Sequence, residues 1–263
     1  MSKFKTTEIS NPEFESNNLR FITIKTPNLK GRGDICVFVP PMEDLKDVPI
    51  VTLLHGVYGS AWIWAHKAGV HFTAIEMMQK GLIKPMVIAM PSDGLFGDGS
   101  GYINHENQKF ENWIANDVIN AVLENINITS KKSPLFIAGL SMGGFGALKL
   151  GAKYHKQYKA ISGHSSITDL NQMSLFVEED MSNYTENSNN LSVIDEILKQ
   201  KNNLPKFRFD CGKNDLLIEQ NRQLHQKLVN ANIPHIYEEF DGEHKWEYWQ
   251  EHIKDTLLFF NQF

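Results

Sequence analysis

The feature that most constrains this 263-residue chain is the motif Gly139-Leu140-Ser141-Met142-Gly143, which matches the pattern G-x-S-x-G. An apolar run, PLFIA, precedes the motif, and a helix-like stretch, GFGALKLGAKY, follows it. A strand that turns sharply into a helix at such a serine lifts the hydroxyl above the sheet and sets it at the positive end of the helix dipole. Glycines flank the serine because side chains there would strike neighbouring elements. The motif therefore predicts that Ser141 is a nucleophile.

Strand-like and helix-like segments alternate along nearly the whole chain, and this alternation predicts an α/β fold with a mainly parallel sheet and helices on both faces. The expected strands span Leu19–Thr26, Asp34–Pro40, Ile50–Leu54, Met86–Met90, Leu135–Leu140, Ala160–Gly163, Phe207–Cys211 and Ile236–Phe240. The expected helices span about Asn112–Glu124, Met142–Lys153, Leu217–Asn230 and Trp246–Phe260. Turn residues between the first two strands, Pro27-Asn28 and Gly31-Arg32-Gly33, indicate an antiparallel edge at the N-terminal side of the sheet.

Length and composition favour a single domain, residues 1–263, with no nucleic-acid or membrane partner. Hydrophobic residues make up 41% and charged residues 22% of the chain, and its formal net charge is -5. This balance is typical of a globular protein and offers no basic surface for a phosphate backbone or an anionic membrane. The N-terminal stretch MSKFKTTEISNPEFESNN lacks the apolar core of a signal peptide. A cytoplasmic enzyme is expected, with a mature secreted form as the alternative.

One segment, about 165–204, departs from the alternating rhythm and contains no clear strand. It leaves the sheet one strand after Ser141, so it begins at the edge of the sheet where ligands bind in such folds. Its first part carries an apolar cluster that includes Met173 and Phe176, and residues 191–198 repeat apolar side chains at helical spacing. The segment is expected to form either a cap over the acyl pocket, the space beside Ser141 that would hold the acyl group of a substrate, or a surface segment with a minor core of its own.

The two cysteines, Cys36 and Cys211, lie in or at the end of expected buried strands. Neither has a partner at CxxC or CxH spacing, and the stretch SDGLFGDGSG lacks the spacing of an EF-hand or a Walker loop. Buried free thiols are therefore expected in preference to a disulfide, and neither a metal ion nor a cofactor is expected.

A serine hydroxyl needs a base within hydrogen-bond reach, and in this type of fold the partners follow in the order Ser, Asp or Glu, His. Among ten histidines, His244 is favoured because it lies on the loop between the last expected strand and the last helix. The acid should follow the penultimate strand, in FRFDCGKND. Asp215, in the loop beyond that strand, is preferred as the group that orients His244, and Asp210, within the strand, remains the alternative.

The tetrahedral intermediate of acyl transfer needs two preorganised N–H donors. The first is expected to be the backbone of Met142, the residue after the nucleophile. The second is expected in the loop LLHGVYG, where Gly56 lets the backbone turn inward and the N–H of Val57 becomes the donor. An ordinary strand-to-loop turn is the alternative interpretation of that segment.

Together, LLHGVYGS, GLSMGGFGAL, CGKND and DGEHKW resemble the esterase D family of α/β hydrolases, from about the third strand to the last helix. That family includes short-chain acyl esterases, S-formylglutathione hydrolase, feruloyl and acetylxylan esterases, and mycolyltransferases. The resemblance implies an α/β-hydrolase fold, a triad of Ser141, Asp215 and His244, and an oxyanion hole formed by the backbones of Val57 and Met142. The chain carries Phe145 where the formylglutathione hydrolases usually have histidine.

These observations predict a serine carboxylic-ester hydrolase that forms an acyl-enzyme intermediate on short-chain acyl or carbohydrate-linked esters. Acyl transfer on the same triad, S-formylglutathione hydrolysis and a binding protein on a retired hydrolase fold are the alternatives. Aromatic side chains are expected to contact the substrate, although packing under loops is an equal alternative for each. The candidates are Trp62, Phe96, Tyr102 and Trp246, with Trp64 nearby.

Overall fold

The computed structural model describes residues 2–184 and 191–263, which contain a nine-stranded sheet with the order β1-β2-β3-β5-β4-β8-β9-β10-β11. Its strands are β1 Thr7–Ile9, β2 Leu19–Thr26, β3 Gly31–Phe38, β4 Ile50–Leu54, β5 Val87–Pro91, β8 Leu135–Leu140, β9 Tyr158–His164, β10 Lys206–Gly212 and β11 Ile236–Phe240. The six strands β5, β4, β8, β9, β10 and β11 run parallel to one another. Strands β1, β2 and β3 form an antiparallel edge. This confirms the predicted sheet.

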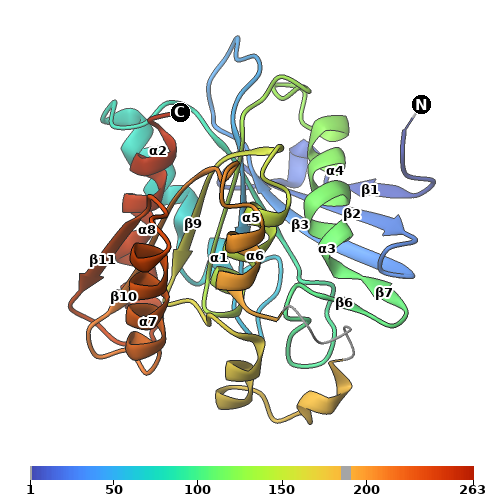
Figure 1. Ribbon diagram of the computed structural model, residues 1–263. Coiled ribbons are helices and arrows are strands. Elements are labelled where there is room, and N and C mark those ends of the chain that lie inside the picture. The colour runs from blue at the N-terminus through green and yellow to red at the C-terminus, as the bar shows by residue number, and fades with distance from the viewer. Residues whose placement is uncertain (1, 185–190) are drawn as a thin grey trace.

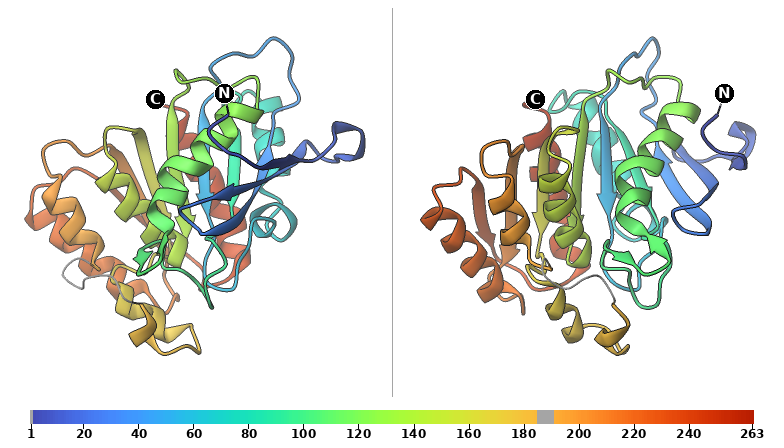
Figure 2. Two further views of the ribbon diagram at one scale, coloured as in Figure 1. Left: turned by 90° about the vertical axis from the view of Figure 1, so that its right-hand side faces the viewer. Right: turned by 45° about the vertical axis from the view of Figure 1, so that its right-hand side comes forward.

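Helices cover both faces of the sheet (Figures 1 and 2). They are α1 Ile63–His66, α2 Val70–Gln79, α3 Phe110–Asn112, α4 Ile119–Asn125, α5 Met142–Lys153, α6 Val193–Lys199, α7 Ile218–Asn230 and α8 Trp246–Phe260, and a π-helical segment, Trp113–Val118, joins α3 to α4. A short hairpin of β6 Asn104–His105 and β7 Gln108–Lys109 precedes α3. One core lies under α3 to α7, and a second core lies under α1, α2 and α8 on the opposite face.

Two details of the predicted elements are wrong. The turn between β2 and β3 consists of residues 27–30, and Gly31 and Gly33 belong to β3. Gly33 is needed for packing, because a Cβ there would lie 2.5 Å from the ring of Trp113. Helices α1 and α2, and the short strand β1, were not predicted.

Within the described residues, no helix is both long enough and apolar enough to cross a membrane. Both cysteines are buried and free, as expected. Burial raises the pKa of the Cys36 thiol to about 12, so this side chain behaves as a small apolar group.

Helix α5, which follows Ser141, is fastened to α3 by a buried ion pair. Glu111 accepts a hydrogen bond of 2.8 Å from Lys149 and also pairs with Lys153. Both Glu111 and Lys149 are buried. Burial raises the pKa of Glu111, but the two lysines outweigh that effect and leave the pKa below its usual value. The carboxylate is therefore charged, and it fixes the position of the helix that Ser141 begins.

Replacing Glu111 by glutamine should destabilise the fold, because the buried ammonium of Lys149 loses the charge that faces it. Removing one partner of a buried ion pair costs about 3–5 kcal/mol in the free energy of unfolding. Chemical denaturation of the Glu111→Gln variant measures this loss. The matched control is Glu76→Gln, which changes an exposed pair with Lys80 and should leave the unfolding midpoint in place. Equal midpoints for the two variants would contradict the assigned role.

Candidate active site

Ser141 lies in the turn between β8 and α5 in a backbone conformation that few residues adopt. Its φ and ψ are 53° and -119°. The turn is held close to the end of β4, because a Cβ on Gly143 would lie 2.5 Å from the carbonyl oxygens of Leu54 and His55. A Cβ on Gly139 would lie 2.3 Å from the carbonyl oxygen of Gly143. The two glycines of the motif therefore have the steric role that the sequence predicted, and Ser141 projects at the carboxyl edge of the sheet.

The structure brings Ser141, His244 and Asp215 together in one hydrogen-bonded chain. The Nε2 atom of His244 lies 3.0 Å from Ser141 Oγ. Its Nδ1 atom lies 3.0 and 2.9 Å from the two carboxylate oxygens of Asp215. Because a carboxylate only accepts hydrogen bonds, Nδ1 carries the proton, and Nε2 is left to accept from the serine hydroxyl. This arrangement can remove the hydroxyl proton as the oxygen attacks.

The loops that carry Asp215 and His244 lie against each other. The backbone N–H of Asn214 donates to the carbonyl oxygen of Gly242, at 2.9 Å. A Cβ on Gly212 would lie 2.5 Å from that same oxygen, so the approach requires glycine. The Asp215 carboxylate is buried and also accepts a hydrogen bond of 2.8 Å from the N–H of Leu217. The acid is thus fixed in place before any substrate binds.

Two aromatic rings enclose the imidazole of His244. Phe176 stacks on it with ring centroids 4.9 Å apart and an interplanar angle of 29°. Trp249 meets it edge-on at 4.9 Å and 89°. Trp249 was missed by the sequence reasoning, although it lies one helical turn after Trp246 on α8. The two rings leave only 12% of the His244 side chain exposed to solvent.

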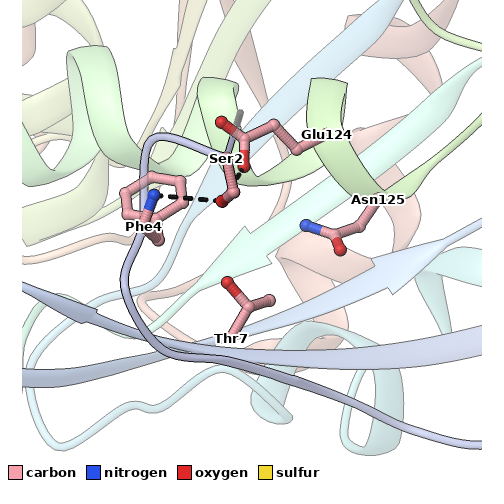
Figure 3. Close-up of a pocket in the computed structure, with 5 residues that line it drawn as sticks. All are labelled: Ser2, Phe4, Thr7, Glu124 and Asn125. Atoms are coloured by element: carbon pink, nitrogen blue, oxygen red, sulfur yellow. Dashed lines mark hydrogen bonds between the residues drawn. The ribbon is translucent and has the colours of Figure 1, made fainter.

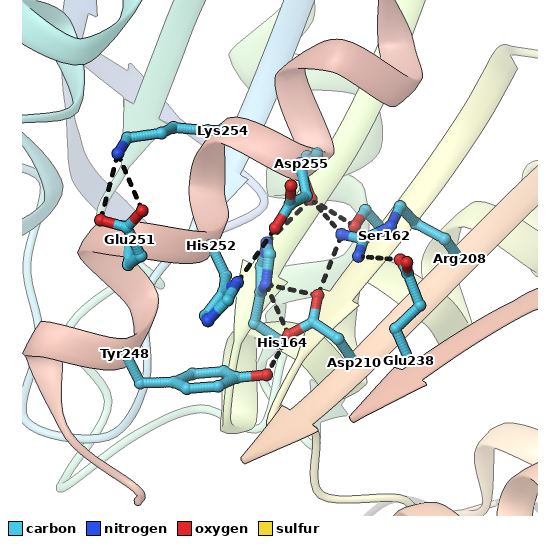
Figure 4. A network of polar contacts seen from close by, with 11 residues as sticks. Ser162, His164, Arg208, Asp210, Glu238, Tyr248, Glu251, His252, Lys254 and Asp255 are labelled. Carbon is cyan, nitrogen blue, oxygen red and sulfur yellow. Dashed lines mark hydrogen bonds and ion pairs between the residues drawn. The ribbon is translucent and has the colours of Figure 1, made fainter. Parts of the chain in front are cut away.

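Asp210, the alternative acid, belongs to a different and fully buried network (Figure 4). It lies 2.9 Å from Nδ1 of His164 and 2.9 Å from the guanidinium of Arg208, and it accepts a hydrogen bond of 2.8 Å from the Tyr248 hydroxyl. On its other side, Nε2 of His164 meets the hydroxyl of Thr256 at 2.8 Å. Asp210 therefore fastens β9 and α8 to β10 and does not contact His244.

The buried network supports the turn that carries Ser141 through backbone hydrogen bonds. The carbonyl oxygen of His164 accepts a hydrogen bond of 2.9 Å from the N–H of Ser141, and that of Asp210 accepts one of 2.8 Å from Ser165. Burial raises the pKa of Asp210, but His164, Arg208 and Tyr248 outweigh it, and the pKa lies below its usual value. The carboxylate is therefore ionised in the folded protein at neutral pH.

The two predicted oxyanion donors lie next to each other. A Cβ on Gly99 would lie 2.5 Å from Sδ of Met142 and 3.4 Å from a methyl group of Val57, so both side chains meet at this glycine. A Cβ on Gly56 would lie 3.4 Å from Cβ of Ser141, which places the loop after β4 beside the nucleophile. Among the described residues, neither backbone N–H donates a hydrogen bond.

The predicted substrate-binding aromatic residues divide into an exposed group and a packed group. Trp62 is 49% exposed, and Trp246 is partly buried and meets the ring of Trp64 edge-on at 5.7 Å. Phe96 stacks on His105 at 4.1 Å. Tyr102 is fully buried, and its hydroxyl donates a hydrogen bond of 3.0 Å to the carbonyl oxygen of His55. Tyr102 thus supports the loop after β4, and its burial contradicts the expectation that it contacts substrate.

The segment 165–204 divides into two parts, and its residues 185–190 lie outside the described residues. The first part protrudes below the sheet in Figure 1, and Phe176 lies within it. Met173 is fully buried and contributes to the core, whereas Phe176 reaches His244. In the second part, α6 packs into the core under α5 and α7. The apolar spacing of residues 191–198 therefore belongs to a helix that returns to the body.

A pocket in Figure 3 lies away from these residues, where the N-terminal segment crosses the end of α4. It is lined by Ser2, Phe4, Thr7, Glu124 and Asn125. The Ser2 hydroxyl donates to Glu124 at 2.6 Å, and the N–H of Phe4 donates to Ser2 Oγ at 3.1 Å. These contacts fasten the N-terminal segment to α4, and the residues that line this pocket include no histidine. In the part of the chain that the structure describes, no group of three or more His, Cys, Asp or Glu side chains could hold a metal ion.

Comparison with known proteins gives consistent matches over most of the chain. The family model described as "Putative esterase" matches residues 26–260. An acetyl esterase from Caldicellulosiruptor saccharolyticus is 26% identical over 258 residues, which cover 91% of this chain and 90% of that protein. A ferulic acid esterase structure superposes with a TM-score of 0.81 at 22% identity, covering 98% and 99% of the two chains. An S-formylglutathione hydrolase from Staphylococcus aureus superposes with a TM-score of 0.77 at 18% identity, covering 96% and 98%. These structures establish the α/β-hydrolase fold.

The buried network predicts how the stability of the protein depends on pH. Because the pKa of Asp210 is lower in the folded state, its stabilising contribution is complete above the pKa of an unfolded aspartate, about 3.9, and is lost as the pH falls through the folded pKa. Asp210→Asn should therefore reduce the free energy of unfolding most at neutral pH, and the difference from the parent protein should shrink below about pH 4. Denaturant titrations at several pH values test this. Asp195→Asn, an exposed change on α6, is the control. A deficit in Asp210→Asn that stays constant from pH 7 to pH 3 would contradict it.

Proposed function

The chain belongs to this esterase family and is a carboxylic ester hydrolase, and we propose that it works through Ser141 as nucleophile, His244 as base and Asp215 as the group that orients the base. The observation that carries this proposal is the continuous contact from Ser141 Oγ through both ring nitrogens of His244 to the Asp215 carboxylate. Each of the three residues comes from a different loop, and these loops meet at the carboxyl edge of the sheet, where α/β folds place their sites.

In the acylation step, Ser141 Oγ forms a bond to the ester carbonyl carbon while its proton passes to Nε2 of His244. The carbonyl oxygen becomes an oxyanion, which accepts hydrogen bonds from the N–H groups of Val57 and Met142. The carbon–oxygen bond to the alcohol then breaks, and Nε2 returns the proton to the departing alcohol oxygen. In the deacylation step, water gives a proton to Nε2 as its oxygen forms a bond to the acyl carbon. The bond from that carbon to Ser141 Oγ then breaks, and Nε2 returns the proton to Oγ, which releases the acid and restores both Ser141 and His244.

Asp215 has two tasks in this scheme. It holds the tautomer in which Nδ1 carries the hydrogen, and it stabilises the imidazolium that forms during each step. Its burial and its second hydrogen bond from Leu217 support these tasks, because a fixed carboxylate needs little reorganisation as charge develops. The buried Asp210 is the poorer candidate because His164 and Arg208 already occupy its carboxylate.

We propose short acyl groups as the preferred acid part of the substrate. The first part of the segment 165–204 acts as a cap, since Phe176 covers one face of His244 and narrows the space beside the nucleophile. Exposed Trp62 lies in the segment after the oxyanion loop and offers a stacking surface for a sugar or aromatic alcohol. An acetyl ester, free or carried on a carbohydrate, fits both features. The acetyl esterase relative is consistent with this proposal.

Removing the nucleophile tests the central assignment. Ser141→Ala should lower kcat for an acetyl ester by about 10⁶-fold, as loss of the nucleophile does in comparable triads. A serine-directed fluorophosphonate should label the parent protein at Ser141 alone, as peptide mass spectrometry would show. Ser174→Ala, which changes an exposed serine in the cap, is the matched control and should keep both activity and labelling. Near-full activity in Ser141→Ala would refute the assignment.

Comparing two aspartates tests the choice of the orienting acid. Asp215→Asn should lower kcat by about 10⁴-fold, because the amide favours the wrong imidazole tautomer. Asp210→Asn should lower stability but reduce kcat by less than about 10²-fold for the fraction that remains folded. Asp210 bonds to His164, Arg208 and Tyr248 and can affect the triad only by displacing it, and a displacement of about 1 Å costs up to about 10²-fold. Active-site titration with the fluorophosphonate corrects for the folded fraction. The opposite ranking of the two variants would assign the orienting role to Asp210.

A further inference from the structure

The loop between β5 and β6 joins the oxyanion loop to the cap, and Asp98 is at the centre of the junction. Its carbonyl oxygen accepts a hydrogen bond of 2.8 Å from the N–H of Tyr58, the residue after Val57. Its carboxylate accepts one of 2.8 Å from the N–H of Glu178, and its own N–H donates 2.8 Å to the Glu179 carboxylate. One residue therefore bonds to both the oxyanion side and the cap side of the site.

Tyr58 forms a second bridge between the same two segments. Its hydroxyl donates to the carbonyl oxygen of Phe176 at 2.9 Å and lies 3.3 Å from the Asp98 carboxylate. A hydroxyl has one proton to give, and the shorter contact identifies Phe176 as its main acceptor. Tyr58 has a φ of 58°, in the left-handed region that non-glycine residues rarely adopt. The strain persists because the contacts on both sides hold it.

Close packing at Gly97 and Gly99 brings together the loop 97–99, the loop that carries Val57, and the cap. A Cβ on Gly97, whose φ is 50°, would lie 2.0 Å from the Glu179 carboxylate. A Cβ on Gly99 would lie 2.5 Å from Met142, beside Val57. The carbonyl oxygen of Gly99 also accepts 2.7 Å from the hydroxyl of Tyr184, at the far end of the described cap. The loop 97–99 therefore lies between the oxyanion donors and the cap and touches both.

From these contacts we propose that Tyr58 and Asp98 form a latch that holds Phe176 on the imidazole of His244 and so fixes the base and the oxyanion loop as one unit. Both are positioning residues: neither touches the reacting atoms, and each acts through Phe176. The proposal rests on the proposed function, since it assumes that His244 is the base. It assigns the cap a part in turnover, beyond the limit that it sets on acyl size.

The consequence is a defect in kcat when the latch is broken. With Phe176 released, the ring of His244 gains freedom to rotate away from Ser141, and misplacing a catalytic group by about 1 Å can cost up to about 10²-fold. Tyr58→Phe, which removes one hydroxyl from a residue that is 58% exposed, should lower kcat for 4-nitrophenyl acetate about three- to tenfold. Asp98→Ala should lower kcat further than Asp98→Asn, because asparagine keeps an acceptor for the N–H of Glu178. KM should change by less than about twofold in all three variants.

A double-variant cycle provides the decisive measurement. If Tyr58 acts through Phe176, Tyr58→Phe should have almost no effect on kcat in a Phe176→Ala background, and the two losses should not multiply. Tyr237→Phe is the matched control, because that hydroxyl donates to Glu239 on β11, and its kcat should equal that of the parent. Thermal unfolding midpoints confirm that each protein compared is folded.

The latch is refuted if Tyr58→Phe keeps the parent kcat, or if its loss is just as large in the Phe176→Ala background. A Tyr58→Phe protein that does not fold is replaced in the cycle by Asp98→Asn, for which the same non-additivity is expected. Failure of the latch is distinct from failure of the proposed function. In the first case Ser141→Ala remains inactive while Tyr58→Phe is normal, and in the second case Ser141→Ala itself remains active.

Discussion

The backbone contact between the turn after β8 and the end of β4 determines everything else at this site. Gly143 meets the carbonyl oxygens of Leu54 and His55 at a distance that leaves no room for a side chain. That approach brings the loop with Val57 beside Met142, and it holds Ser141 in a conformation that few residues accept. The strain is a local cost of the kind that persists only where the surroundings fix it, and the two packed cores on opposite faces of the sheet supply that constraint here.

Two of the histidine–aspartate pairs among the described residues, His164 with Asp210 and His244 with Asp215, have nearly the same geometry, and their surroundings give them different roles. His164 and Asp210 are completely buried. The Nε2 atom of His164 contacts the hydroxyl of Thr256, which also forms hydrogen bonds with Ser162 and Arg208. In the second pair, His244 with Asp215, the imidazole contacts Ser141 at the carboxyl edge of the sheet. Identical chemistry thus serves as an internal cross-link in one place and as a candidate proton relay in the other. The partner of Nε2 and its access to solvent decide which.

Much of the sheet and the three proposed catalytic residues could be predicted because their signals are local. Strand β8 follows from an apolar run and helix α5 from the helix-like stretch after the motif, and chain order favoured His244. The choice of Asp215 over Asp210 depended on where β10 ends, which the sequence could only place to within a few residues. In the structure Asp210 lies within β10, three positions before the loop begins at Lys213, whereas Asp215 lies in that loop.

Other features depended on contacts that no local pattern reports. The N-cap residue of helix α2 is Gly69, which adopts a left-handed conformation and has no side chain to cap the helix. The polar N-cap residue that usually indicates the start of a helix is therefore missing from the sequence. Tyr102 looked like a rim residue in a glycine-rich loop, yet it fills the space beside Gly146 and is fully buried. The bridge formed by Tyr58 joins segments more than 100 residues apart, and only the folded chain reveals it.

The order of strands in the sheet also constrains how the chain can reach this structure. Strand β4 pairs on one side with β5 and on the other with β8, whose partner residues lie about eighty positions later. Loop-closure entropy must be overcome before such distant pairing becomes favourable, so folding should be slow compared with that of a helical bundle of similar stability. During synthesis, the edge of β4 that pairs with β8 stays unpaired until β8 has emerged from the ribosome. The active constellation can form only after His244 has left the ribosome, and until then the exposed edge is a site where aggregation can begin.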